Sequence, residues 1–281
     1  AVCRKKQADV IAERGFRMTG LWGEGNFPFS CGESVPEGID FDYILITAKS
    51  IDTADLCEQF RGVLAGHEVV SLQNGIGNEE IIAANTDRVI GGTIITGFVW
   101  KGTAEVSVTV EAGPIRLGRF PDGLDPTVLT LVDLMNSSGM RAEGSEHIRS
   151  DLWSKTIYNC ALNPLGAVME VPYGELADPA AWSIIEDIVR EAFTVVHAEG
   201  VHLPWGNADS YLHYLQSFQL PSTASHHSSM LQDIQRGRKT EIDFLNGAVV
   251  ARARALGIPA PVNAVVSDLI RFKERLATSG G

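Results

Sequence analysis

The first half of the chain alternates short apolar runs with amphipathic stretches, and this alternation limits the possible folds more than any other feature. Apolar runs at 42–47, 67–72 and 88–91 have the length and composition of buried parallel strands. Apolar residues at helical spacing lie between them, at 51–65 and 78–84. Strands that alternate with helices in this way predict a doubly wound parallel sheet. Ligands bind beyond the carboxyl ends of the strands in such sheets.

The pattern changes after residue 102. Val106, Val108 and Val110 alternate with polar residues, and Ile115 and Leu117 alternate in the same way beyond a Gly-Pro pair. Two alternating runs joined by a short turn predict an antiparallel hairpin.

From about residue 145 the sequence is almost wholly helical. A helix at 125–135 and a short strand precede this point, and further helices are predicted at about 148–160, 179–199, 207–218, 226–237, 240–256 and 262–276. We therefore expect an α/β fold followed by an all-α fold, with domains at 1–145 and 146–281. The length agrees, since single cores stop growing at roughly 250–300 residues.

Charge and apolar content exclude some classes of function. The formal net charge of -12 argues against a nucleic-acid partner, because phosphate binding needs clustered lysine and arginine. The longest apolar stretch, at 89–100, is shorter than the roughly 20 residues that span a bilayer, so we expect no membrane association. The 4 cysteines are scattered and no signal peptide is visible, which favours reduced thiols in a cytoplasmic protein. We also expect no metal site.

One element of a dinucleotide-binding domain is missing from its expected place. Such domains open with a strand, a GxGxxG motif and a helix whose N-terminus holds the pyrophosphate. The segments at 23–28 and 75–80 are the nearest approximations, and neither has the third glycine. We therefore expect the sequence to begin at the second strand of the sheet, with roughly thirty residues of the domain before it.

Lys155, Asn159 and Asn163 fall at i, i+4 and i+8 of a predicted helix, so one helix face carries an amine and two amides. Asparagine is a mediocre helix former, so two at this spacing favour a role in hydrogen-bonding a ligand. A solvated polar face is the alternative that these residues leave open.

Two further segments have both a structural and a functional interpretation. Thr240 and Asp243 form a capping-box pattern that predicts a helix start, with Glu241 at the first helical position. The helix dipole alone also favours an acid there. Asn74 lies in a glycine-rich segment directly after a predicted strand. This segment is either a ligand-binding loop at the end of the strand or only a turn made by the glycines.

Together, three sequence blocks resemble those of one family. The blocks are LQNGIGNEE, LWSKTIYNCALNPLGAV and SSMLQDIQRGRKTEIDFLNG, in this order along the chain. They are similar to the signature blocks of ketopantoate reductases, and the resemblance covers essentially the whole chain apart from the missing glycine motif. It implies a Rossmann-type N-terminal domain and a helical C-terminal domain of the 6-phosphogluconate dehydrogenase type.

The resemblance implies a role for each matching residue on the substrate side. Lys155 matches the lysine that acts as general acid, and Glu241 matches a catalytic glutamate. Asn159, Asn163 and Ser229 match residues that contact the substrate. The implied reaction is the reduction of a small 2-keto acid, 2-dehydropantoate, to pantoate, a step of pantothenate and coenzyme A biosynthesis. A positioned ammonium suits it, because hydride addition leaves charge on the carbonyl oxygen.

The resemblance also implies NADPH as the cofactor and allows a homodimer. Asn74 matches an asparagine that reaches the bound nucleotide, and Lys49 matches a lysine that follows the preceding strand. Arg4, with Lys5 and Lys6 beside it, matches the basic residue that favours the 2′-phosphate. A cluster of solvated charges is the alternative for this basic run. The residues themselves do not predict an oligomeric state.

Three positions depart from the family pattern. His226 stands where asparagine is common, Gly166 stands for a threonine, and Tyr173 replaces an asparagine that contacts substrate in some members. His226 is three residues before Ser229, so a shared helix would place both on one face, where the imidazole could bind substrate. The alternative is that His226 begins an exposed helix. A reductase of another branched or aromatic 2-keto acid therefore stays open, as does a nucleotide-binding sensor without turnover.

Overall fold

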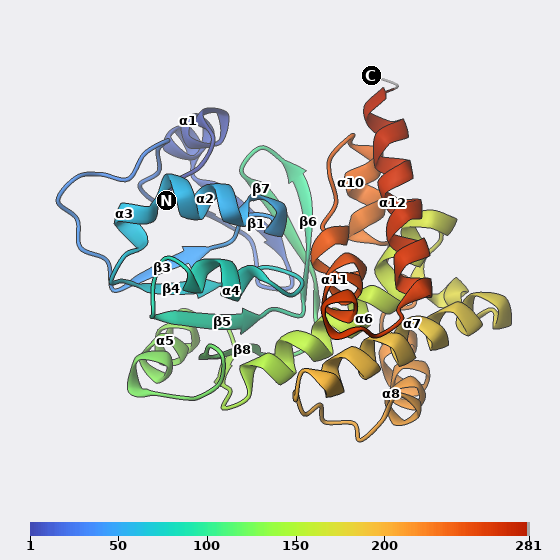
Figure 1. Ribbon diagram of the computed structural model, residues 1–281. Helices are drawn as coiled ribbons and strands as arrows, with labels where there is room; N and C mark the ends of the chain where they lie inside the picture. The colour runs from blue at the N-terminus through green and yellow to red at the C-terminus, as the bar shows by residue number, and fades with distance from the viewer. Residues whose placement is uncertain (280–281) are drawn as a thin grey trace.

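The computed structural model describes residues 1–279 and divides them between a half built on sheets and a half built of helices (Figure 1). Gly280 and Gly281, the last two residues of the predicted helical domain, lie outside the described residues. Within residues 1–279, no helix is both long enough and apolar enough to cross a membrane.

A five-stranded sheet forms the centre of the N-terminal half. Its order is β3 (Tyr43–Ile46), β4 (Glu68–Ser71), β5 (Val89–Thr93), β8 (Ile115–Arg119) and β9 (Ala142–Gly144). The first three strands are parallel, which confirms the prediction from the apolar runs. Strand β8 is antiparallel to β5, and β9 is parallel to β8.

Helices cover both faces of this sheet. One face carries α2 (Thr53–Gln59), α3 (Arg61–Leu64) and α4 (Asn78–Ala83), and the turn η1 (Ser50–Asp52) leads into α2. The other face carries α5 (Pro126–Ser137) (Figure 1). Val69 packs with the first group of helices and Val70 with α5, because successive side chains of a strand point to opposite faces. The doubly wound arrangement is thus confirmed for β3 to β5.

A second sheet has the order β2 (Gly25–Phe27), β1 (Phe16–Gly20), β7 (Glu105–Glu111) and β6 (Thr96–Gly102), and it follows α1 (Lys5–Arg14). Strand β7 pairs antiparallel with β6, whereas β8 pairs with β5 in the central sheet. The hairpin predicted around Gly113 and Pro114 is therefore wrong. Alternation identified both runs as strands, but it fixes which side chains share a face and not which strand is the partner.

The C-terminal half is helical. Its helices are α6 (Ile148–Met169), α7 (Pro179–Ala198), α8 (Ala208–Tyr214), α9 (Leu220–Ser222), α10 (Ser229–Gln235), α11 (Asn246–Leu256) and α12 (Pro261–Ser279). Shorter turns lie between them at η2 (Tyr173–Ala177), η3 (Leu215–Gln219, a π-helix) and η4 (Ile242–Phe244). Helix α6 contacts β5 and β8 and also α7, α10 and α12, so it joins the two halves (Figure 1).

Helix α6 continues past Pro164, beyond the predicted end at residue 160. A proline has no N–H, so Pro164 cannot bond to the carbonyl of Cys160. The side chain of Asn246 in α11 donates to that carbonyl instead, at 3.2 Å. The main chain therefore stays satisfied, and the helix runs on to Met169.

The predicted capping box at Thr240 is wrong. Helix α11 begins at Asn246, and only the short turn η4 follows Glu241. The Thr240 hydroxyl accepts from the Ile242 N–H at 3.2 Å, but both predicted capping residues also bind α12: the Thr240 hydroxyl donates to Glu274 at 2.5 Å, and Asp243 accepts from Arg271 at 2.6 Å. Glu241 is thereby left outside a helix.

Candidate active site

Lys155 lies on α6 near the junction of the two halves and is partly buried. No side chain or carbonyl among residues 1–279 accepts a hydrogen bond from its ammonium. Burial lowers the pKa of Lys155 to about 8, although the charges of Glu241 and Glu79 oppose that shift. Such a lysine keeps its proton at neutral pH and is a stronger acid than an ordinary lysine.

The two amides on the next turns of α6 have different surroundings. Asn159 is partly buried, and its side chain has no hydrogen-bond partner within the described part of the chain. Asn163 is 7% exposed, and its Oδ1 accepts from the Ser228 hydroxyl at 2.6 Å and from the Met230 N–H at 3.2 Å. Its Nδ2 donates to the Ser229 hydroxyl at 3.2 Å. Asn159 is thus available to a ligand, whereas Asn163 ties α6 to the start of α10.

Glu241 reaches from the helical half to the ends of the parallel strands. Its Oε1 accepts from the N–H and from the hydroxyl of Ser50, both at 3.1 Å, and its Oε2 accepts from the Asn74 amide at 3.1 Å. Ser50 follows β3 and Asn74 follows β4. Lys155, Glu241 and Asn74 therefore belong to one group at the carboxyl edge of the sheet, where ligands bind in such folds.

The loop after Asn74 makes a second contact between the halves. The Ile76 N–H donates to the Phe244 carbonyl at 2.8 Å. Gly75 has a φ of 84°, and a Cβ placed on it would lie 2.3 Å from the same carbonyl oxygen. Only glycine fits at position 75, because of the positive φ and because of the closeness of the Phe244 carbonyl.

Lys49 makes a third contact, an ion pair with Asp233 of α10. Burial raises the pKa of Asp233, and Lys49 opposes part of that rise. A ligand that uses Lys49 would therefore compete with Asp233 for its ammonium.

His226 lies outside α10, which begins at Ser229 with Ser228 as its N-cap. The prediction that His226 sits one helical turn before Ser229 is therefore wrong. Its ring packs edge-on against Tyr173, with centroids 5.3 Å apart. Burial, with a contribution from His227, lowers the pKa of His226, so its imidazole is neutral at pH 7.

The two other departures from the family pattern are neighbours in space. A Cβ on Gly166 would lie 3.2 Å from the Tyr173 ring and 3.3 Å from Ser228. Tyr173 is 3% exposed, and its ring also lies 6.3 Å from that of Tyr158. The missing side chain at Gly166 thus leaves room for the Tyr173 ring beside Ser228.

Arg4 is exposed immediately before α1, and no contact in the described residues joins it to the group around Lys155. Sequence reasoning missed two members of that group, Ser50 and Asp233. Both carried a signal, since Ser50 follows a predicted strand and Asp233 falls inside the third family block. Across residues 1–279, no three His, Cys, Asp or Glu side chains could together hold a metal ion.

The chain matches family models over most of its length. Residues 1–122 match the model described as ketopantoate reductase PanE/ApbA, and residues 147–274 match the model of the C-terminal part of the same family. A 2-dehydropantoate 2-reductase of Pyrococcus horikoshii is 33% identical over 97% of this chain and 88% of its own length. The corresponding protein of Archaeoglobus fulgidus is 32% identical, also over 97% and 88%.

Solved structures agree with this assignment. The PanE/ApbA family ketopantoate reductase of Ralstonia eutropha aligns with a TM-score of 0.86 at 28% identity, over 98% of this chain and 90% of that one. A D-mandelate dehydrogenase solved with NADH and anilino(oxo)acetate has a TM-score of 0.87 at 24% identity, over 98% and 89%, and shares the fold. With both halves of the family model, full-length relatives and the fold in agreement, the chain belongs to the ketopantoate reductase family of oxidoreductases.

Proposed function

We propose that the protein reduces 2-dehydropantoate to pantoate with NADPH, in pantothenate and coenzyme A biosynthesis. The observation that carries the proposal is Lys155, a partly buried ammonium with a pKa of about 8 and no hydrogen-bond partner within residues 1–279. Relatives named 2-dehydropantoate 2-reductase support the substrate.

The residues around Lys155 supply an acid and polar anchors. Reduction of the keto group leaves negative charge on its oxygen, and the Lys155 ammonium stabilises that charge and then donates a proton to it. Glu241 favours the charged form of Lys155. The Asn159 amide and the exposed Ser229 hydroxyl would bind the substrate without adding charge. His226 is a further proposed contact, and Asn163 would position the Ser229 hydroxyl through the bond from its Nδ2.

The ends of β3 and β4 suit a nicotinamide cofactor. Asn74 and Lys49 follow adjacent parallel strands, and a glycine loop leaves the second strand beside them. We propose that Asn74, Lys49 and Arg4 hold the cofactor, which supplies a hydride when it is bound. For Asn74 and Lys49 this requires exchange of their present partners, Glu241 and Asp233.

We expect a preference for NADPH over NADH that depends on Arg4. A guanidinium binds the 2′-phosphate with charge-assisted hydrogen bonds worth roughly 1.5–3 kcal/mol, about 10–100-fold in kcat/KM. Arg4→Gln should remove most of this preference, measured as the ratio of kcat/KM for the two cofactors.

Arg14→Gln is the matched control, because it removes the same charge from the other end of α1 and should leave the ratio unchanged. Equal kcat/KM for NADPH and NADH in the unaltered protein would contradict the cofactor assignment. A basic run that is only solvated would give that result.

The substrate is tested by NADPH oxidation with a panel of 2-keto acids. We expect the highest kcat/KM with 2-dehydropantoate, compared with 2-ketoisovalerate and phenylglyoxylate. Tyr173 and His226 depart from the family pattern and pack together with Tyr158, which favours one alternative, a reductase of an aromatic 2-keto acid. A higher kcat/KM for phenylglyoxylate would establish it. Cofactor binding without oxidation of NADPH by any member of the panel would identify a sensor instead.

The proposal also includes the domain boundary, the cellular location and the oligomeric state. Strand β9 ends at Gly144 and α6 begins at Ile148, which supports a domain boundary near residue 145. A cytoplasmic location and a homodimer suit a biosynthetic reductase of this family. Sedimentation of the purified protein tests the dimer.

A further inference from the structure

Glu79 is a buried carboxyl group that the fold does not fully satisfy. It lies in the first turn of α4 and is 1% exposed. Its Oε1 has no hydrogen-bond partner among the residues that the structure describes. Buried polar atoms almost always have partners, so an exception of this kind calls for a functional explanation.

Glu79 packs between the central sheet and α6. A Cβ built on Gly91 of β5 would meet Ile148 at 3.0 Å, Leu152 at 3.4 Å and Glu79 at 3.6 Å, so these side chains share the space above Gly91. Leu152 is three residues before Lys155 and lies on the same face of α6. Glu79 therefore approaches the part of α6 that carries the proposed acid.

The charges around Glu79 couple it to that acid. Burial raises the pKa of Glu79 to about 7; the Ser71 hydroxyl on β4 and Arg252 on α11 lower it, and the neighbouring Glu80 raises it. The charge of Glu241 raises the pKa of Lys155, and the charge of Glu79 raises it further. Ionised Glu79 therefore favours the protonated form of Lys155.

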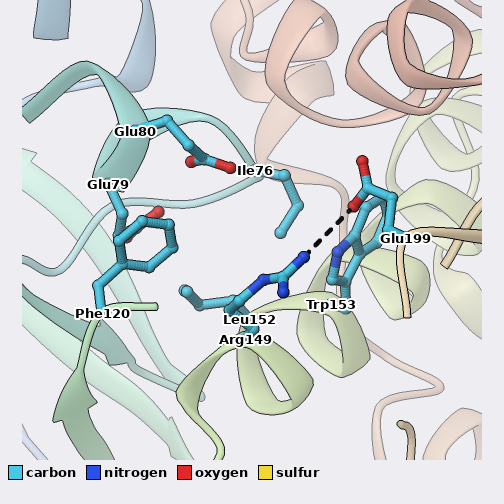
Figure 2. Close-up of a pocket in the computed structure, with 8 residues that line it drawn as sticks. All are labelled: Ile76, Glu79, Glu80, Phe120, Arg149, Leu152, Trp153 and Glu199. Carbon is cyan, nitrogen blue, oxygen red and sulfur yellow. Dashed lines mark ion pairs between the residues drawn. The ribbon is translucent and has the colours of Figure 1, made fainter. Parts of the chain in front are cut away.

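A pocket connects Glu79 to solvent. Figure 2 shows Glu79 on one side of this pocket and Glu199 on the other, with Arg149 between them. The cavity volume is about 10 Å³, which is room for about one water molecule. Glu80 and Arg149, which also line it, are both accessible to solvent. The buried carboxyl can thus exchange its proton with solvent through this pocket.

We propose that Glu79 is a positioning residue for Lys155, exchanging its own proton through this pocket and, by its charge, keeping Lys155 protonated between turnovers. The inference rests on the proposed function, in which Lys155 gives a proton to the product oxygen in each cycle. The proton that Lys155 regains comes from solvent, so that one proton is consumed for each keto group reduced. When Glu79 is ionised, its negative charge opposes the loss of the proton from Lys155.

Glu79→Gln tests this, because it keeps the shape and removes the charge. We expect the pKa of Lys155 to fall by about one, as for loss of a nearby opposite charge. At pH 8, where half of Lys155 is protonated in the unaltered protein, the protonated fraction and kcat should then fall about 5-fold. The pKa is measured without turnover, from the pH dependence of acetylation of Lys155 by acetic anhydride, quantified by peptide mass spectrometry.

Two variants serve as controls. Glu58→Gln removes an exposed charge that lies outside this pocket and should leave the Lys155 midpoint in place. Glu79→Asp keeps the charge and should keep the midpoint near that of the unaltered protein. An unchanged midpoint in Glu79→Gln, or an equal fall in Glu79→Asp and Glu79→Gln, would overturn the inference. Failure of the proposed function is a separate result, since an inactive protein would still give the acetylation midpoints.

Discussion

Lys155→Ala should lower kcat for 2-dehydropantoate by roughly 10²–10⁴-fold, the usual loss for one positioned general acid. The ammonium is the only group in the described cluster that is placed to give a proton and has no hydrogen-bond partner within residues 1–279. Binding of NADPH, measured by fluorescence titration, should stay nearly unchanged, because Lys155 serves the substrate and not the nucleotide. A variant that keeps kcat within tenfold of the unaltered protein would remove Lys155 from its role.

The fold should tolerate this loss. The pKa of Lys155 falls from 10.5 to about 8 on folding, so the folded state disfavours the charged amine. This penalty is fully present below pH 8 and is relieved as pH rises from 8 towards 10.5. Lys155→Met, which keeps the methylene packing and removes the charge, should therefore be as inactive as Lys155→Ala at pH 7 yet unfold at the same or a higher temperature. A large drop in the melting temperature of Lys155→Met would show that the lysine is structural.

The parts of the fold that could be predicted are those encoded locally. Continuous apolar runs identified β3, β4 and β5. Strands β4 and β5 are largely buried on both faces and need no polar positions, whereas the edge strand β3 leaves Leu45 exposed. The hairpin failed for the opposite reason. The alternation correctly identified its two strands, β7 and β8. It did not indicate their partners, because β7 pairs with the preceding strand β6 and not with β8.

In the candidate site, too, the locally encoded features could be predicted and the contacts between distant segments could not. Spacing along α6 placed Lys155 and Asn159 on one face, and the family blocks added Glu241 and Asn74. What could not be predicted is which groups these residues meet. Thr240 gave a good local capping signal, and its hydroxyl does accept from the Ile242 N–H at 3.2 Å, but it also donates to Glu274 of α12, and only the short turn η4 follows. Glu79 gave no signal beyond an acid near a helix start, since its burial arises only when α6 packs on β5.

Asn163→Ala should destabilise the protein by about 2–4 kcal/mol, which is a different outcome from the loss of a substrate contact. The change leaves the Met230 N–H without its acceptor in a buried site and removes the bond to Ser229, and each buried group left unsatisfied costs about 1–3 kcal/mol. For a chain of this size the melting temperature should fall by about 5–15 °C. The Ser228 hydroxyl keeps two partners, the Asn163 carbonyl at 2.7 Å and the Leu231 N–H at 3.1 Å, so the fold should survive.

Asn159→Ala is the matched control, one turn earlier on the same helix. Its amide has no hydrogen-bond partner within residues 1–279, so its loss should leave the melting temperature within about 1–2 °C, since substitutions away from buried networks stay within about 0.5 kcal/mol. It should instead raise KM or lower kcat for the keto acid, because the free amide is the one available to bind it. The opposite pattern, with an unchanged melting temperature and a raised KM for Asn163→Ala, would make Asn163 a substrate contact in its own right. The expected pattern would show instead that two identical side chains on one helix face differ in role because of their partners, with Asn163 holding α10 in place and Asn159 holding the substrate.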